Sequence, residues 1–581
     1  MIHAVKDLRA FWDIVRKHRN WVALGLLAFL VVDGLQLFIP RVIKMGVDDL
    51  TLRGSGANLP RYFFYILVIA VAIAVLRFAA RYLLLGTSWK MAEELRNRIY
   101  KHILSLHPTF YHDRKPGDVI AHVINDVRAV RFAVGMGFVA LSHTIVLGFA
   151  SVAFMVYIDL KLTLITILPM PFLTATTWFF SRRLYQRFGR VQEAVSHLTE
   201  RVREGLSGIR VIKAYSQMAR QTSALERVGE EFVQKNLDLA RIWALVFPSM
   251  LFFTNISMIL LLNWGGRQTI FMAITPGDFV AFVNYLVLLT WPMMALGWII
   301  NLVQRGRASL GRINAILATQ PSIRDKTPAT SPEKTVKGNI RIERLSFAYN
   351  GGPPALQDVN VYAEAGSKIA IVGRTGAGKT TLCNLLPRLL DPPAAKIFID
   401  DVDIHNIPLE VLRGCISYIP QQAFLFSGSV RENLLFSRPQ ATDEQLEKVL
   451  RTAGLHEEVA SFPDGLDTIV GEKGIMLSGG QRQRLCLART LLRDTPIYIL
   501  DDPLSAVDKA KEVAILQSLK DAFKGRTIVM VSHRIASLMD AGVIYVLDRG
   551  RVIEVGTHEE LVRRDGLYNE LYQLQGLEES Q

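Results

Sequence analysis

Residues 373–380 read Gly373-Arg374-Thr375-Gly376-Ala377-Gly378-Lys379-Thr380. They follow the apolar segment Lys368–Val372 and precede the helix-forming run Thr381–Leu390. This G-x-x-x-x-G-K-[ST] pattern between a strand and a helix predicts a loop whose backbone N–H groups surround phosphate oxygens. Lys379 would neutralise the β- and γ-phosphates, and the Thr380 hydroxyl would hold Mg²⁺. The stretch therefore predicts an α/β domain whose loop binds a chain of phosphates together with Mg²⁺.

A second element of this domain lies downstream. Ile497–Asp501 is an apolar strand that ends in a carboxylate, the expected partner of Mg²⁺ at the carboxyl edge of a parallel sheet. The three cysteines all fall in this half of the chain and share no metal-ligand spacing. We expect them to be reduced packing residues of a domain that faces the cytosol. They are Cys383, Cys415 and Cys486.

The first 303 residues are far more apolar than the remainder. Of all 581 residues, 50% are hydrophobic, and the mean hydropathy is +0.24. Six stretches approach or exceed the ~20 residues that cross ~30 Å of hydrocarbon as a helix. They cover 21–43, 62–86, 132–158, 161–181, 242–265 and 277–303. The sequence predicts an all-α, six-helix transmembrane domain over 21–303 and no cleaved signal peptide.

Basic residues set the predicted topology. The net charge is +14, and Lys and Arg gather before the first span and in the long segments 87–130 and 182–241. We interpret this excess as the cytoplasmic side of a membrane protein, not as a nucleic-acid surface. The N-terminus and the second half are then cytoplasmic, and both long segments are predicted to be helical extensions of the spans. Residues 1–20 are predicted to form an amphipathic segment on the membrane surface.

A polar stretch separates the two halves. Residues 304–340 include the proline-bearing segment Thr327–Lys334, which is typical of a domain boundary. We expect a linker over 304–340 and the nucleotide-binding domain over 341–581.

Further motifs of the second half carry a family resemblance. Leu477–Gln481 reads L-S-G-G-Q, and it is preceded by Tyr349 and Gln421 and followed by Ser505–Asp508 and His533. The order and spacing of these motifs resemble those of the ATP-binding-cassette (ABC) family, and the resemblance covers almost the whole chain. Six spans with two long loops on the same chain resemble its exporter branch, not an importer or a soluble DNA-repair ATPase. The segment 468–472 resembles an exporter-type loop that touches the transmembrane domain.

The resemblance implies an ATPase that couples ATP hydrolysis to export and works as a dimer. Tyr349 would stack on adenine, Gln421 would sense Mg²⁺ and the attacking water, and His533 would contact the γ-phosphate. Ser478 and Gly480, at a helix N-terminus, would hold the γ-phosphate of ATP bound to the other subunit. The implied nucleotide-binding residues are Tyr349, Gly373, Arg374, Thr375, Gly376, Ala377, Gly378, Lys379, Thr380, Thr381, Ser478, Gly479, Gly480, Gln481 and Asp508, with Thr380, Gln421 and Asp501 as metal ligands and Asp502, His533 and Gln421 as catalytic residues.

Asp502 departs from the family pattern, which has Glu after the metal-binding Asp. The shorter side chain sets its carboxylate roughly 1.5 Å further back, and misplacement on that scale can cost ~100-fold in rate. We therefore predict a heterodimer with a weakly hydrolytic site in this chain and a partner that carries Glu. The pattern resembles bacterial heterodimeric exporters of the multidrug type, which implies a location in the inner membrane. The cargo would be a small amphiphile or a lipid. A homodimeric flippase or multidrug exporter is the alternative, and an ATP-gated channel or regulatory protein is a more remote one.

Four polar residues fall within the apolar spans. Asp33, His143, Asn255 and Asn284 either share a polar cavity or make hydrogen bonds between helices.

Overall fold

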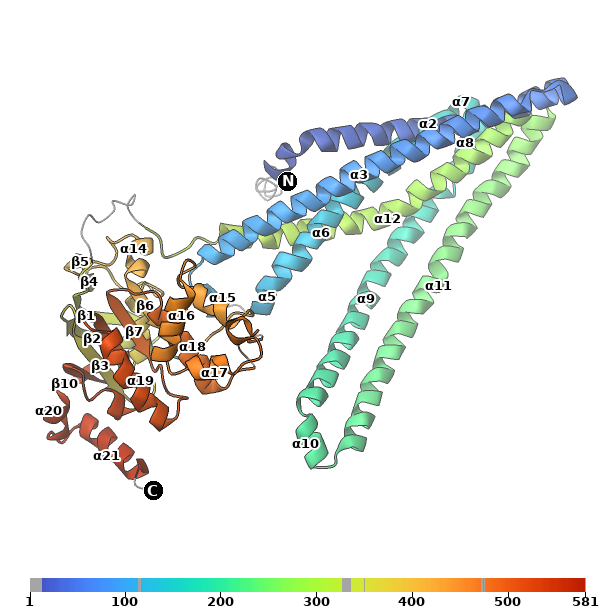
Figure 1. Ribbon diagram of the computed structural model, residues 1–581. Coiled ribbons are helices and arrows are strands. Elements are labelled where there is room, and N and C mark those ends of the chain that lie inside the picture. The colour runs from blue at the N-terminus through green and yellow to red at the C-terminus, as the bar shows by residue number, and fades with distance from the viewer. Residues whose placement is uncertain are drawn as a thin grey trace. The chain divides into compact units, whose positions relative to one another are not determined.

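The computed structural model describes residues 13–112, 116–325, 336–349, 351–471, 474 and 476–579 (Figure 1). The chain forms two compact units. The first holds residues 1–104 and 115–319, and the second holds residues 105–114 and 320–581. The first unit is helical, whereas the second is α/β.

Six helical stretches of the first unit are long and apolar enough to cross a membrane, which confirms the six predicted spans. Two of them are composite, because short π-helical turns or a break at Leu168 divide them. The elements are α2 (Arg19–Arg53); α3 (Leu59–Ser105); α5 (Pro116–Ala121), η2 (His122–Asp126), α6 (Val127–Phe132), η3 (Ala133–Gly137) and α7 (Phe138–Ile158); α8 (Leu160–Ile167) and α9 (Met170–Ser207); α11 (Met218–Ile270); and α12 (Pro276–Ala318).

Local sequence determines where these helices begin. Asp159 caps α8, because its Oδ1 accepts a hydrogen bond from Leu162 N at 2.5 Å. Thr275 and Asp278 form a reciprocal capping box at the start of α12, with Pro276 in the first turn. Each device satisfies backbone N–H groups that the helix itself leaves unpaired.

Several helices continue well beyond their apolar stretches. α3 runs to Ser105, α9 runs to Ser207, and α11 starts at Met218, so much of 87–130 and 182–241 is helical, as the periodicity predicted. Figure 1 shows α9 and α11 side by side, with the short α10 (Ile209–Ala214) between their ends. Arg187 donates to Asp238 at 2.6 Å and so joins the two long helices.

One predicted domain boundary differs from the structure, and parts of other predictions fall outside the described residues. Residues 304–318, expected in the linker, are the last part of α12. The helix continues because no proline interrupts it and because Leu310, Ile313 and Ile316 are buried at three-residue spacing. Residues 1–12 of the amphipathic segment, 326–335 of the linker, and Glu472 lie outside the described residues.

Two of the four polar residues of the spans meet between helices, as one of the two readings expected. Asp33 on α2 is buried and meets His143 Nδ1 on α7 at 2.7 Å. Asn284 donates to Val280 O of its own helix, and Asn255 is exposed. Sequence spacing places a residue along a helix but does not determine how neighbouring helices are rotated.

The second unit contains two sheets. A four-stranded antiparallel sheet has the order β2-β1-β4-β5, and a six-stranded, mainly parallel sheet has the order β10-β9-β3-β8-β7-β6. The strands are β1 (Ile340–Ala348), β2 (Pro354–Ala363), β3 (Lys368–Gly373), β4 (Ile397–Ile399), β5 (Val402–Asp403), β6 (Ile416–Ile419), β7 (Ile497–Asp501), β8 (Thr527–Val531), β9 (Val543–Asp548) and β10 (Arg551–Gly556).

Except for its edge strand β10, the larger sheet is largely buried on both faces, as its continuous apolar strands indicate. In β3, Ile369 and Ile371 pack in the core with the smaller sheet, whereas Ala370 and Val372 pack with the helices. The helices that follow β3 in this unit are α13 (Lys379–Leu385), α14 (Leu409–Gly414), α15 (Val430–Leu435), α16 (Asp443–Thr452), α17 (His456–Ala460), α18 (Gly479–Leu491), α19 (Lys509–Ala522), α20 (His558–Val562) and α21 (Leu567–Glu579). The predicted fold class, a six-helix transmembrane domain followed by an α/β domain, is confirmed.

The Asp33–His143 contact generates a stability prediction. His143→Ala should leave the buried Asp33 carboxylate without its partner, which typically costs ~3–5 kcal/mol. Asp33→Asn should cost much less, because the amide can still bond the imidazole and no charge remains buried. Thermal unfolding of the detergent-solubilised protein measures both, with the exposed Asn255→Ala as the control. Equal losses from His143→Ala and Asn255→Ala would contradict a role for this pair in holding α2 against α7.

Candidate functional site

The loop between β3 and α13 requires glycine at two positions. Gly378 has φ +103°, and a Cβ there would lie 2.7 Å from Ala355 O. Gly373 has φ +155°, and a Cβ there would lie 2.0 Å from Leu547 O. A side chain would clash with backbone at either position, so only glycine fits there. Glycine also adopts these positive φ angles without strain, which allows the tight turn at the carboxyl end of the strand. Residues 374–376 in the middle of the loop are exposed.

Lys379 starts α13 and folds back across this loop. Its buried ammonium donates to Gly373 O at 2.7 Å and to Arg374 O at 2.9 Å. Burial lowers the pKa of Lys379, and the negative charges of Asp501 and Asp502 oppose that shift. The loop thus holds a cation against exposed backbone, an arrangement that suits a phosphate chain.

Asp501 ends β7, two strands from β3 in the sheet order. Its side chain is 1% exposed, and among the described residues no group donates to its Oδ2. Burial raises the pKa of Asp501, and the Thr380 hydroxyl, which bonds this carboxylate, lowers it. A buried carboxylate with free lone pairs beside a hydroxyl is the donor set that Mg²⁺ prefers. The residues present therefore fit the metal.

Gln421, the third predicted metal ligand, follows β6, which pairs with β7. Its side chain is exposed. No group of three or more His, Cys, Asp or Glu side chains suited to a metal occurs among the residues that the structure describes. An amide, a hydroxyl and one carboxylate remain consistent with a cation whose other ligands are phosphate oxygens and water.

Asp502 lies directly after Asp501 in a left-handed conformation, with φ +53°. Its backbone N–H donates to Val531 O at 2.8 Å, and its Oδ1 accepts from His533 N at 3.5 Å. Asp502 is buried, whereas the His533 side chain is exposed. A left-handed aspartate costs roughly 1 kcal/mol, so the turn holds a strained residue at the end of the strand.

The predicted adenine contact, Tyr349, lies beside α13. Tyr349 Oη is 3.0 Å from Thr381 Oγ1, and its ring meets Phe347 edge-on at 5.2 Å. The tyrosine side chain is 43% exposed, so a ring face is available for stacking. The structure thus gathers Tyr349, residues 373–381, Asp501, Asp502 and His533 around one loop.

The L-S-G-G-Q segment borders a different hollow, of about 600 Å³. Ser478 caps α18, with Ser478 Oγ accepting from Gln481 N and Gln481 Oε1 accepting from Ser478 N. None of residues 373–381 is among those that line this hollow. The lining residues are Glu458, Ser478, Gly479, Gly480, Gln481, Arg484, Ala506, Val507, Asp508 and Lys511.

Sequence reasoning missed Glu458, although its carboxylate contacts three other residues that line this hollow. It accepts hydrogen bonds from Gln481 at 2.8 Å, Arg484 at 2.9 Å and Lys511 at 2.6 Å. Burial alone would raise the pKa of Glu458, but these three donors lower it to about 2. No sequence signal marks Glu458, because its partners come from two other helices.

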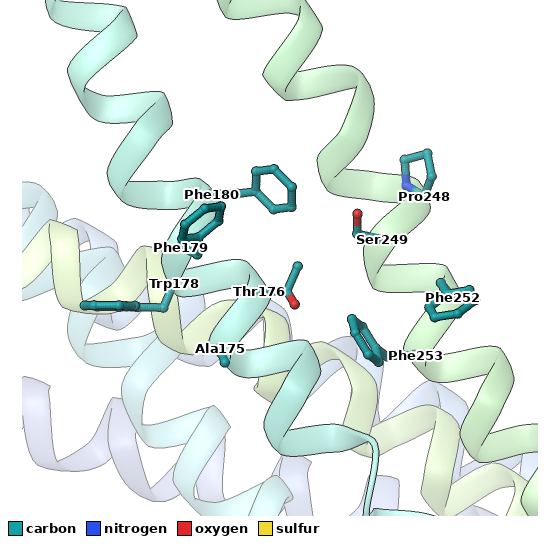
Figure 2. A pocket seen from close by; sticks show the side chains of 9 residues that line it. All are labelled: Ala175, Thr176, Trp178, Phe179, Phe180, Pro248, Ser249, Phe252 and Phe253. Atoms are coloured by element: carbon teal, nitrogen blue, oxygen red, sulfur yellow. The ribbon is translucent and has the colours of Figure 1, made fainter.

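The first unit contains a pocket that the sequence did not indicate. About 830 Å³ of space lies between α9 and α11, near Pro248 (Figure 2). Five aromatic side chains line it, and Figure 2 shows them on both helices: Trp178, Phe179, Phe180, Phe252 and Phe253. Such a lining suits an apolar or aromatic molecule.

A family model matches each of the two units. The model of the ABC transporter transmembrane region matches residues 22–293, and the ABC transporter model matches residues 356–505. The chain also resembles a solved bacterial Atm1-family ABC exporter with ATP bound, at TM-score 0.80 and 25% identity, covering 96% of this chain and 99% of that one.

Curated relatives align over nearly the full length. The multidrug resistance-like ATP-binding protein MdlA of Escherichia coli (strain K12) is 36% identical, over 98% of this chain and 96% of its own length. The probable multidrug resistance ABC transporter protein YheI of Bacillus subtilis (strain 168) is 34% identical, over 98% and 96%. The ATP-dependent lipid A-core flippase of Syntrophus aciditrophicus (strain SB) is 30% identical, over 97% and 93%.

Replacing the loop lysine tests the phosphate site. Lys379→Ala should weaken nucleotide binding at least tenfold, because a charge-assisted contact contributes ~1.5–3 kcal/mol. Photolabelling of this chain with an azido-ATP analogue over a concentration series measures the change. The exposed Lys524→Ala is the control, and unchanged labelling of Lys379→Ala would refute the assignment.

Proposed function

The chain belongs to the ABC exporter family, and we propose that it is one half of a heterodimeric exporter whose own phosphate loop lines a weakly hydrolytic site. The family membership establishes an ATPase that couples ATP hydrolysis to transport across the bacterial inner membrane.

The separation of phosphate loop and signature supports a composite site. The signature serine Ser478 lines a hollow to which neither Lys379 nor the rest of the phosphate loop contributes. ABC exporters act as dimers, and in a dimer the signature of each chain would close over the loop of the other. Ser478 and Gly480, at the start of α18, would then face the γ-phosphate with N–H groups at the positive end of the helix.

The residues around the loop would each act on the bound nucleotide. Tyr349 would stack on adenine, residues 373–381 would hold the phosphates, and His533 would contact the γ-phosphate. Thr380, Asp501 and Gln421 would hold Mg²⁺, which when bound neutralises charge on the phosphates. The unpaired Asp501 Oδ2 supports the metal assignment.

Asp502 is the single observation that carries the unequal-site proposal. It occupies the position that Glu takes in the family, and its carboxylate is held near the backbone N–H of His533. The shorter side chain leaves ATP binding intact but sets the carboxylate back from the attacking water. A partner with Glu at this position would hydrolyse ATP with the help of this chain's intact signature.

An amphiphilic cargo agrees with the aromatic pocket. The space between α9 and α11 offers five aromatic rings, and Arg183 lies 4.3 Å from the centre of the Phe179 ring. A ring-bearing or acyl-chain molecule with a polar end fits that lining. The basic residues before the first span and in the segments 87–130 and 182–241 support a cytoplasmic location for the N-terminus, the long helical extensions and the second unit.

A homodimeric lipid flippase is the second candidate. Its support is the intact L-S-G-G-Q signature, since a homodimer would then have two complete signatures, and the similarity to a lipid A-core flippase over 97% of the chain. In that arrangement both sites would contain Asp502.

Substitutions at position 502 separate the two candidates. In a heterodimer, Asp502→Asn should change steady-state ATPase activity less than twofold, whereas Glu→Gln in the partner should nearly abolish it, because one site performs the hydrolysis. Activity of the complex purified from membranes measures this, with Lys524→Ala as the control.

In a homodimer, Asp502→Asn should remove most of the activity and Asp502→Glu should raise it. A severe loss from Asp502→Asn in a complex of two different chains would show that the shorter carboxylate is a working catalytic residue, and the unequal-site proposal would be wrong.

A further inference from the structure

The helix α21 is fastened to the second unit by its first turn. Tyr568 is fully buried, and its hydroxyl is hydrogen-bonded to His558 Nδ1 at 2.8 Å. Leu567 N donates to Glu554 Oε1 at 2.6 Å. Burial raises the pKa of Tyr568 to about 12, so this hydroxyl stays protonated at neutral pH. The start of the helix therefore has a fixed position in the unit.

Two turns later, Gln575 uses both ends of its amide on one short segment. Its Nε2 donates to His533 O, and its Oε1 accepts from Ile535 N at 2.9 Å. Both partners are backbone groups of the segment that leads from β8 into the first residue of the 3-10 turn η6 (Ile535–Ser537). A single side chain thus brackets residues 533–535 from a distant part of the chain.

This bracketed segment faces the nucleotide site. His533 N donates to Asp502 Oδ1 at 3.5 Å. The imidazole itself is exposed. Contacts therefore run from Gln575 through the backbone of His533 to the carboxylate after β7.

We infer that Gln575 is a positioning residue of the ATP site, which fixes residues 533–535 so that the His533 imidazole reaches the γ-phosphate. The inference rests on the proposed role of His533. Without the amide, the buried Ile535 N–H and the His533 carbonyl lose their partner, and the segment must move to find others. A shift of about 1 Å at a phosphate contact can cost up to ~100-fold in rate.

The neighbouring ion pair of α21 contributes less. Arg374 of the phosphate loop contacts Glu570 at 2.8 Å, but both side chains are more than half exposed, at 57% and 53%. Exposed ion pairs of this kind are screened by water and contribute little to stability. Glu570→Gln should therefore leave the kinetics nearly unchanged, which separates the bracket of Gln575 from general docking of the helix.

The test uses the full complex with Asp502→Glu in this chain and, if the partner is a different chain, Gln in place of its catalytic Glu, so that turnover reports this site. Gln575→Ala should lower kcat about tenfold with KM changed less than about threefold. Gln573→Ala is the matched control, because its side chain reaches Asn569 of the same helix. Gln575→Glu keeps an acceptor for Ile535 N and loses the donor to His533 O, so it should cause an intermediate loss of kcat. This variant replaces Gln575→Ala in the test if the alanine variant unfolds.

A double-mutant cycle distinguishes positioning from a merely structural role. In a His533→Ala background, Gln575→Ala should cause no further loss, because its effect passes through that residue. Additive losses, or a normal kcat for Gln575→Ala while His533→Ala is inactive, would overturn this inference alone. Full activity of His533→Ala would overturn the proposed role of His533 together with it.

Discussion

In the second unit the phosphate loop lies apart from the hollow that the signature lines, and the proposed mechanism follows from that separation. The phosphate loop is built where β3 passes into α13, and the signature is built at the start of α18, beside a separate hollow. ATP would therefore hold two chains together, with phosphates on one and the signature of the other. The energy of closing that interface is what an exporter can deliver to its membrane helices.

The sheet order explains why the phosphate-binding groups gather at one edge. β3, β8 and β7 are adjacent and parallel, so the loop, His533 and the pair Asp501–Asp502 follow neighbouring strands at their carboxyl ends. Burial makes the Asp501 charge costly unless a cation meets it, and the same burial lowers the pKa of Lys379. A bound metal–phosphate group would relieve both groups at once.

Much of this could be predicted from sequence, because the decisive signals are local. Six apolar stretches, the glycine loop after a strand and a strand ending in Asp501 each carry their own context. Contacts between distant segments left no such signal: Glu458 joins α17 to α18 and α19, and Gln575 reaches the segment after β8. The linker was set too long because α12 continues without a breaker. Which polar residues of the spans would meet was left open, because the rotation of each helix about its axis depends on tertiary packing.

The most direct measurement identifies the nucleotide on this chain while the complex turns over. The purified complex is supplied with azido-ATP labelled at either the α- or the γ-phosphate, then irradiated in the steady state, and the labelled chains are separated. The account predicts that this chain keeps the γ-label nearly as well as the α-label, because Asp502 leaves its ATP intact, whereas the partner keeps mainly the α-label. Loss of the γ-label from this chain, with the α-label retained, would mean that its own site hydrolyses ATP and would contradict the account.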